Sequence, residues 1–234
     1  MISIILPSFG RAQQLQEMFL SAINMSDKPE DIELCVFIEE PDKDTENTLV
    51  QLSKNFNVKW VVNPNGNRVI ISQMTNEAAK LSSGDILMFA ADDIRFETQD
   101  FDSIVNNIFF KFKDKILLCG GQDGYISEKQ RFITHGFISR QWYDTVGWLI
   151  PPWFDGSYGD TTVNRLGDII NRKIILPIMI RHYHFAAGNS VMDYTMQLKF
   201  EKERKQNTGM LFYEMFPKIR EEAIKLWEYI LANK

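Results

Sequence analysis

Residues 71–96 read ISQMTNEAAKLSSGDILMFAADDIRF, a helical pattern that passes through a turn into a buried strand. Helical spacing extends over residues 69–82 and ends at a Ser-Gly pair, which is typical of a helix terminus. Ile86–Phe89 is a short apolar run of strand type, and two adjacent carboxylates, Asp92 and Asp93, follow it closely. A helix followed by a buried strand is one unit of an α/β fold.

The same alternation precedes this unit. The predicted strands cover residues 2–6, 32–38 and 58–62, and the predicted helices cover residues 11–25 and 45–56. Strands that alternate with helices indicate a parallel sheet covered on both faces. We therefore predict an α/β, Rossmann-like fold with a mostly parallel central sheet flanked by helices. In such sheets, ligands bind beyond the carboxyl ends of the strands, where polar residues are concentrated in this chain.

The second half of the chain has a more mixed pattern. Helices are predicted at residues 100–114 and 161–171, and strands at residues 116–119, 131–138 and 174–180. The chain is predicted to be helical from Met192 onward. Pro217 is expected to begin a new helix there, because proline is tolerated in a first helical turn.

Composition excludes several classes of protein. The chain has 234 residues, of which 44% are hydrophobic and 24% charged, as in a folded globular protein. A net charge of −5 without a long Lys/Arg run excludes the large basic surface of a tight nucleic-acid binder. Cys35 and Cys119 lie in apolar runs without zinc-site spacing, which predicts buried reduced thiols. The absence of a basic leader and of a membrane-length apolar run predicts a soluble, cytoplasmic protein.

The Asp92-Asp93 pair is the strongest local signal. Two carboxylates at the end of a buried strand are unfavourable unless positive charge neutralises them, and a hard cation such as Mn²⁺ or Mg²⁺ would do so. The alternative is an ordinary helix N-cap pair. The position opposite other polar strand ends favours the metal.

The turn PSFGR, residues 7–11, follows the first strand. Its backbone amides can contact an anion or a nucleobase, and Arg11 can clamp a phosphate. The alternative is a plain strand-to-helix turn capped by Ser8. A dinucleotide-binding fold would place a GxGxxG motif here, and its absence disfavours NAD or FAD.

Together, ISIILPSFGR, VFIEEPD and residues 71–96 resemble the GT-A glycosyltransferases, especially family 2, over roughly residues 2–188. The resemblance implies a catalytic domain at residues 1–188, with a donor half (1–96) and an acceptor half (97–188), and a helical extension at residues 189–234. It implies that Glu39, where the family usually has Asp, holds the nucleobase with Pro7 and Ser8. The donor-binding residues expected in all are Pro7, Ser8, Arg11, Glu39, Arg68, Asp92 and Asp93. Of the two aspartates, Asp93 is expected to bind the metal and Asp92 the ribose.

The resemblance also implies a catalytic base at the start of the helix in FDGSYGDTTVNRL. Asp160 fits this role, with Asp155 as the second candidate, since an inverting transfer needs a carboxylate near the acceptor hydroxyl. The alternative is that Asp160 caps the helix, and both roles are compatible. Nearby aromatic residues either stack on the acceptor or belong to the core; they are Trp153, Phe154 and Tyr158.

Two of the three histidines lie in HYHF, at i and i+2, which places them on the same face of a strand. The resemblance implies that one of them completes the metal or diphosphate site, with His184 ahead of His182. The alternative is that both are satisfied by neighbours. His135, in ITHGF, is assigned to the acceptor side.

These residues predict a metal-dependent glycosyltransferase that uses a nucleotide-diphosphate sugar, with UDP-sugar favoured, and inverts the anomeric configuration. One alternative is a nucleotidyltransferase of related fold, which usually has a glycine-rich basic loop after its first strand. Another is a sugar- or nucleotide-binding module without catalysis. The acceptor is left open among a glycan, a protein, a small molecule and, last, a hydroxylated nucleic-acid base.

Overall fold

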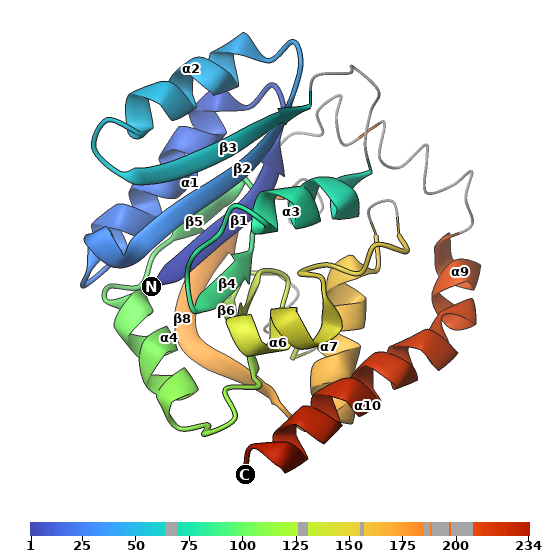
Figure 1. The fold of residues 1–234 in the computed structure, drawn as a ribbon. Coiled ribbons are helices and arrows are strands. Elements are labelled where there is room, and N and C mark those ends of the chain that lie inside the picture. The colour runs from blue at the N-terminus through green and yellow to red at the C-terminus, as the bar shows by residue number, and fades with distance from the viewer. Residues whose placement is uncertain (64–69, 126–130, 155–156, 185–187, 189–196, 198–207) are drawn as a thin grey trace.

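The computed structural model describes residues 1–63, 70–125, 131–154, 157–184, 188, 197 and 208–234. In these residues, eight strands form one sheet in the order β3-β2-β1-β4-β7-β6-β8-β5 (Figure 1). The strands are β1 (Ile2–Ser8), β2 (Ile32–Glu39), β3 (Asn57–Asn63), β4 (Ile86–Phe89), β5 (Ile94–Phe96), β6 (Leu118–Gln122), β7 (Gly136–Ser139) and β8 (Lys173–His182).

The first four strands are parallel, as the alternating pattern predicts. Ile4 of β1 pairs with Leu34 of β2 on one side and with Met88 of β4 on the other. The second half is mixed, because β7 runs antiparallel to β4 and β6, whereas β8 is parallel to β6. The predicted α/β fold with a central sheet is therefore confirmed.

Helices cover both faces of the sheet (Figure 1). One face carries α1 (Ala12–Met25), α2 (Lys43–Leu52) and α4 (Phe101–Phe110), and the other carries α3 (Ile71–Ala79), α6 (Arg140–Val146), α7 (Gly159–Ile169) and α10 (Phe216–Ala232). The described residues also form two short helical segments, η1 (Pro29–Asp31) and α9 (Thr208–Glu214). In β1, Ile4 and Leu6 belong to the first core and Ile5 to the second, as expected for a strand buried on both faces.

Two local predictions and one alternative differ from the structure. Pro7 stays inside β1, because the ladder with β4 ends at Ile5 and the missing N–H of proline removes no bond there. The residues after Asp93 form strand β5 and not a capped helix, because β5 pairs with β8. The strand predicted at residues 131–138 begins only at Gly136.

The C-terminal helix packs onto the main body of the fold. Ile219, Ala223 and Leu226 of α10 are buried in the same core as Trp142 of α6. Pro217 lies in the first turn of α10, as predicted. Most of the predicted helix between residues 192 and 207 lies outside the described residues. Both cysteines are buried and free, as expected.

None of the helices in the described part of the chain has the length and apolar character that crossing a membrane requires.

Candidate active site

The loop after β1 holds the first carboxylate of the Asp pair. The hydroxyl of Ser8, the last residue of β1, donates to Oδ2 of Asp92 over 2.8 Å. The Nη1 atom of Arg11 donates to Oδ1 of the same carboxylate, also over 2.8 Å. Asp92 is only 4% exposed. Burial raises the pKa of Asp92 and the Asp93 charge adds to this, while Arg11 and Ser8 oppose it.

The loop after β2 contacts the loop after β1 through Asp42, a residue that the sequence analysis missed. Its Oδ2 accepts the N–H of Gly10 over 2.7 Å, and its Oδ1 accepts the N–H of Thr45 at the start of α2 over 3.2 Å. The available signal was an N-cap Asp before a helical pattern. Glu39 ends β2 beside these loops, opposite Asn63 of β3, and it is partly buried.

Asp93, the second carboxylate, is more open to a ligand. Its Oδ2 lies 3.8 Å from Nη1 of Arg11, and its Oδ1 lies 3.4 Å from Nε2 of His182. This Oδ1 is buried and accepts no hydrogen bond of good geometry from any described residue. Burial acts to raise the pKa of Asp93, but His182, with His135 and Arg11, outweighs it and lowers the pKa to about 2. Asp93 is therefore ionised at neutral pH and has an oxygen available for a ligand.

The pairing of β5 with β8 brings Asp93 and His182 together. Ile94, directly after Asp93, lies opposite His182 in this antiparallel ladder. The N–H of Tyr183 donates to the carbonyl oxygen of Asp93 over 2.8 Å. Backbone geometry thus fixes the carboxylate and the imidazole relative to one another.

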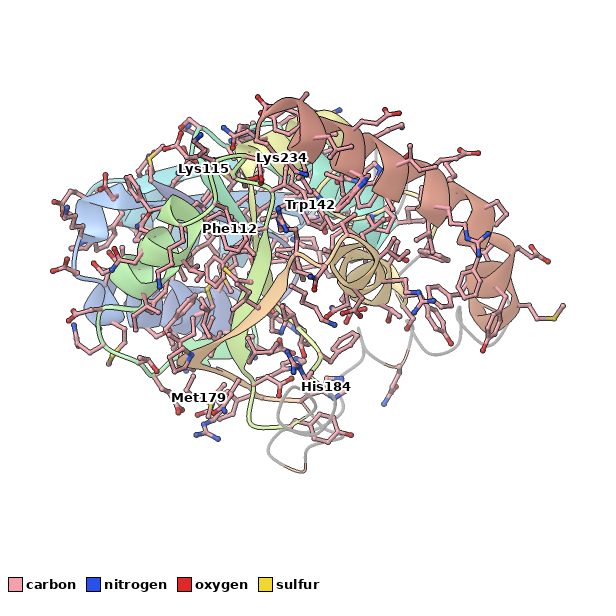
Figure 2. All side chains as sticks on the ribbon, turned by 90° about the horizontal axis from the view of Figure 1, so that it is seen from below. Phe112, Lys115, Trp142, Met179, His184 and Lys234 are labelled. Atoms are coloured by element: carbon pink, nitrogen blue, oxygen red, sulfur yellow. The ribbon has the colours of Figure 1, made fainter. Side chains whose placement is uncertain are left out.

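The three histidines gather beside Asp93. The ring of His182 lies 4.7 Å from that of His135, edge to face, and 5.1 Å from that of His184. His184 follows the end of β8 and lies on the lower side of the sheet in Figure 2. Of the two histidines considered for the metal, His182 has its Nε2 atom 3.4 Å from Oδ1 of Asp93, and the preference for His184 stays a prediction.

His135 is held neutral inside this group. Burial lowers its pKa to about 3, and the neighbouring His182 contributes, although Asp93 and Asp123 act in the opposite direction. Its Nε2 atom is buried and has no hydrogen-bond partner among the described residues. His135 therefore offers a neutral imidazole nitrogen beside the Asp93 carboxylate.

Asp123, which is not among the predicted site residues, positions this group. Its carbonyl oxygen accepts the N–H of His182 over 2.9 Å. Its side chain accepts the hydroxyl of Thr134 over 2.5 Å and the N–H of Tyr125 over 2.8 Å. One buried residue at the end of β6 thus joins the strand end that carries His182 to the segment that carries His135. The signal was the polar QDG sequence at the end of an apolar strand.

Asp160 lies in the first turn of α7 and is partly buried. Its Oδ1 accepts the N–H of Thr161 in the same turn over 2.7 Å, but the N-cap residue of α7 is Tyr158 and not Asp160. The amide of Asn164 donates to the carbonyl oxygens of Asp160 and Ile133, over 2.9 and 2.8 Å. The start of α7 is thereby anchored to the segment that carries His135.

The aromatic residues before α7 differ in their surroundings. Phe154 is fully buried, and its carbonyl oxygen accepts the hydroxyl of Ser72 over 2.7 Å. This burial favours the core alternative for Phe154. Tyr158 is partly buried and stacks on Phe212 at 4.9 Å. Trp153 is also partly buried, with Nζ of Lys218 4.8 Å from its ring centroid.

Two predicted site residues, Arg68 and Asp155, lie outside the described residues. Within the described ranges, no group of three or more His, Cys, Asp or Glu side chains is arranged to hold a metal ion. A metal at Asp93 would therefore need ligands beyond these side chains.

Solved structures share this fold at low sequence identity. TarS 1–349 of S. aureus matches with a TM-score of 0.60 and 13% identity, over 77% of this chain and 60% of that chain. The mannosyltransferase PcManGT from Pyrobaculum calidifontis, in complex with GDP-Man and Mn²⁺, matches with a TM-score of 0.64 and 14% identity, over 99% of this chain and 73% of that one. Glucosyl-3-phosphoglycerate synthase from Mycobacterium tuberculosis, in complex with Mg²⁺ and UDP, matches with a TM-score of 0.54 and 15% identity, over 77% and 69%.

The chain spans about 60% of the length of the TarS 1–349 chain, and these likenesses show the GT-A fold. A search of curated protein sequences finds no match for this chain. The family model described as glycosyl transferase family 2 matches residues 3–191. The chain therefore belongs to glycosyl transferase family 2.

Proposed function

We propose that this protein transfers a sugar from a nucleotide-diphosphate sugar, with UDP-sugar favoured, to an acceptor hydroxyl. The observation that carries the proposal is Asp93, an ionised carboxylate at the carboxyl end of the sheet with a buried, unbonded oxygen next to His182. Membership of the family supports sugar transfer. Among the structures of similar fold, TarS is in complex with UDP-GlcNAc and PcManGT with GDP-Man.

The residues present fit a divalent metal that is shared with the donor. Asp93 supplies a carboxylate oxygen and His182 an imidazole nitrogen, both of which bind Mn²⁺, while Mg²⁺ favours the oxygen. Oxygens of the donor diphosphate would supply the further ligands that the described side chains lack. A bound Mn²⁺ or Mg²⁺ would stabilise the negative charge of the departing diphosphate.

Donor binding is assigned to the loops after β1, β2 and β3. Pro7, Ser8 and Glu39 are proposed to contact the nucleobase at the strand ends. Asp92 holds the Arg11 guanidinium over 2.8 Å, which places a cation beside Asp93, and Arg11 is the proposed phosphate contact. The contact of Asp92 with the ribose stays a prediction. Both oxygens of Asp92 already accept hydrogen bonds, from Ser8 and Arg11.

Transfer itself is assigned to Asp160, with Asp155 as the second candidate. The Asp160 carboxylate accepts the proton of the acceptor hydroxyl, whose oxygen bonds to the anomeric carbon. The bond from that carbon to the diphosphate oxygen breaks, and the configuration inverts. Trp153, Tyr158 and His135 stay the proposed acceptor contacts. The acceptor class is open among glycans, proteins and small molecules, with a hydroxylated nucleic-acid base last.

The test is a release assay with UDP-, GDP-, TDP- and CMP-sugars, each with Mn²⁺ and with EDTA. We expect one nucleoside diphosphate sugar to be hydrolysed slowly without an acceptor, and only with the metal. A parallel assay follows pyrophosphate release from nucleoside triphosphates. Pyrophosphate release would support a nucleotidyltransferase instead, and donor binding without any turnover would support a binding module without catalysis.

A further inference from the structure

Helix α10 has two apolar stripes, and only one of them faces the core. Ile219, Ala223, Leu226 and Ile230 are buried against the neighbouring helices. Ile224, Trp227 and Leu231 form a second stripe, with exposed fractions of 56%, 45% and 49%. Their spacing of three and four residues places them on one side of the helix. Figure 1 shows α10 lying along the outer edge of the molecule, so this second stripe is an accessible surface.

Charged residues flank the second stripe symmetrically. Arg220 lies four residues before Ile224, and Glu228 lies four residues after it. Both side chains are exposed. In an α-helix, four residues correspond to about 6 Å along the axis. Arg220 and Glu228 are thus opposite charges at equal distances on either side of Ile224.

We propose that this surface binds α10 of a second copy of the chain in an antiparallel pair, with a two-fold axis near Ile224. In this arrangement Arg220 faces Glu228 of the partner subunit, and the symmetry repeats the ion pair on the other side of the axis. A parallel pair would instead place Arg220 beside an identical cation. The charges therefore favour a second copy of α10 in the antiparallel direction, while the apolar stripe provides the surface that the pair buries.

An anionic membrane is a less suitable occupant of the same surface. Glu221 and Glu228 lie beside the stripe and would repel anionic lipid. Two of the neighbouring cations are engaged within the chain: Lys225 Nζ lies 3.0 Å from Oε2 of Glu222, and Lys218 lies over the ring of Trp153. The charge pattern thus favours a protein partner of mixed charge, as α10 itself is.

The test is sedimentation equilibrium of the full chain over a concentration series, with single and paired charge reversals. We expect a reversible dimer, which Ile224→Glu converts to a monomer. Arg220→Glu and Glu228→Arg are each expected to raise the dimer Kd about tenfold, because each places like charges opposite one another. The double variant R220E/E228R is expected to return the Kd to near the wild-type value, because it places opposite charges across the interface again. The two positions are too far apart within one helix to pair with each other.

Val50→Glu is the matched control, since Val50 is an exposed aliphatic residue of α2, 40% exposed and remote from α10; it should leave the dimer unchanged. A wild-type monomer at all concentrations would overturn the proposal, as would a failure of the double reversal to restore the dimer. Wild-type protein that stays monomeric but sediments with phosphatidylserine vesicles would assign the stripe to a membrane. The charge variants change only exposed positions, so they test the pairing even if Ile224→Glu does not fold.

Discussion

Two buried carboxylates, at opposite ends of the same sheet, differ in how their oxygens are used. Glu33 lies at the amino end and is fully buried. Its Oε1 accepts hydrogen bonds from Lys59 over 2.5 Å and from the Ser83 hydroxyl over 2.7 Å. Its Oε2 accepts hydrogen bonds from the Ser3 hydroxyl over 2.5 Å and from the Ser83 N–H over 2.8 Å. At the carboxyl end, Asp93 Oδ1 is equally buried, and no described residue gives it a good hydrogen bond.

The two groups have similar acidity for different reasons. Burial acts to raise the pKa of Glu33, but Lys59 and three hydrogen bonds from serines outweigh it and lower the pKa to about 2. The pKa of Asp93 is also about 2, and there the opposing partner is mainly an imidazole. Buried polar groups are normally satisfied, and an unsatisfied one costs about 1–3 kcal/mol. Complete bonding therefore marks Glu33 as a structural residue, whereas Asp93 retains the capacity to bind a ligand.

The largest expected effect is that of Asp93→Ala. We expect donor turnover to fall about 1000-fold, because the proposed metal ligand is lost. The free energy of unfolding should fall as well, because a folded pKa of about 2 means that the folded chain favours the ionised carboxylate. The nucleoside diphosphate release assay and thermal unfolding measure the two quantities. Retained turnover with a large loss of stability would mean that Asp93, like Glu33, is a structural residue.

Asp160→Asn tests the base, with the next largest effect expected. Transfer should fall about 100-fold, because the amide cannot take the acceptor proton, whereas donor affinity should change less than about twofold. Asp168→Asn is the matched control, because Asp168 is a 52% exposed acid on the same helix, paired with Lys173. Equal transfer rates in the two variants would show that Asp160 is not the catalytic base, and Asp155 would then be the candidate.

Glu33→Gln sharpens the comparison from the structural side. We expect a loss of about 2 kcal/mol in the free energy of unfolding at pH 7, with turnover unchanged. The folded pKa lies near 2, below the unfolded value of about 4.3. The stabilisation is therefore present above the unfolded pKa and is lost as pH falls toward 2. Urea unfolding between pH 7 and 2 should show the wild-type advantage shrinking below about pH 4; a constant difference would contradict the assignment.

The smallest expected effect is that of Asp123→Ala. Turnover should fall about tenfold, because the segment carrying His135 loses its bond from Thr134 to the end of β6. Thr134→Val removes the same hydrogen bond and should lower turnover by a similar factor. Steady-state kinetics of the two variants, with circular dichroism to monitor folding, provides the measurement. Wild-type rates in both would show that Asp123 does not position the histidines for the reaction.

Local sequence patterns predict the parallel half of this fold well, because each strand there is a short apolar run bounded by turn residues. They predict the site less completely. β5 was missed because its strand conformation depends on pairing with β8, which lies more than 80 residues later in the chain. The i, i+2 spacing only places both histidines on one face of a strand, and the pairing of β5 with β8 is what brings His182 next to Asp93.

The burial of Phe154 was equally hidden from local pattern. An aromatic residue before a helix start is compatible with a core or with a binding surface, and here packing against Phe212 and a bond to Ser72 decide for the core. Asp42 and Asp123 carried readable signals, an N-cap and a polar strand end. Their importance depends on the partners they bond, which the sequence does not reveal.

The central claim is that the carboxyl end of the sheet binds a nucleoside diphosphate through a divalent metal at Asp93. Isothermal titration calorimetry of UDP and of GDP into the wild-type protein, with Mn²⁺ and then with EDTA, tests it most directly. We predict saturable binding of one nucleotide that requires Mn²⁺ and is lost in Asp93→Ala. Equal affinity with metal and with EDTA, or binding that survives in Asp93→Ala, would contradict the claim.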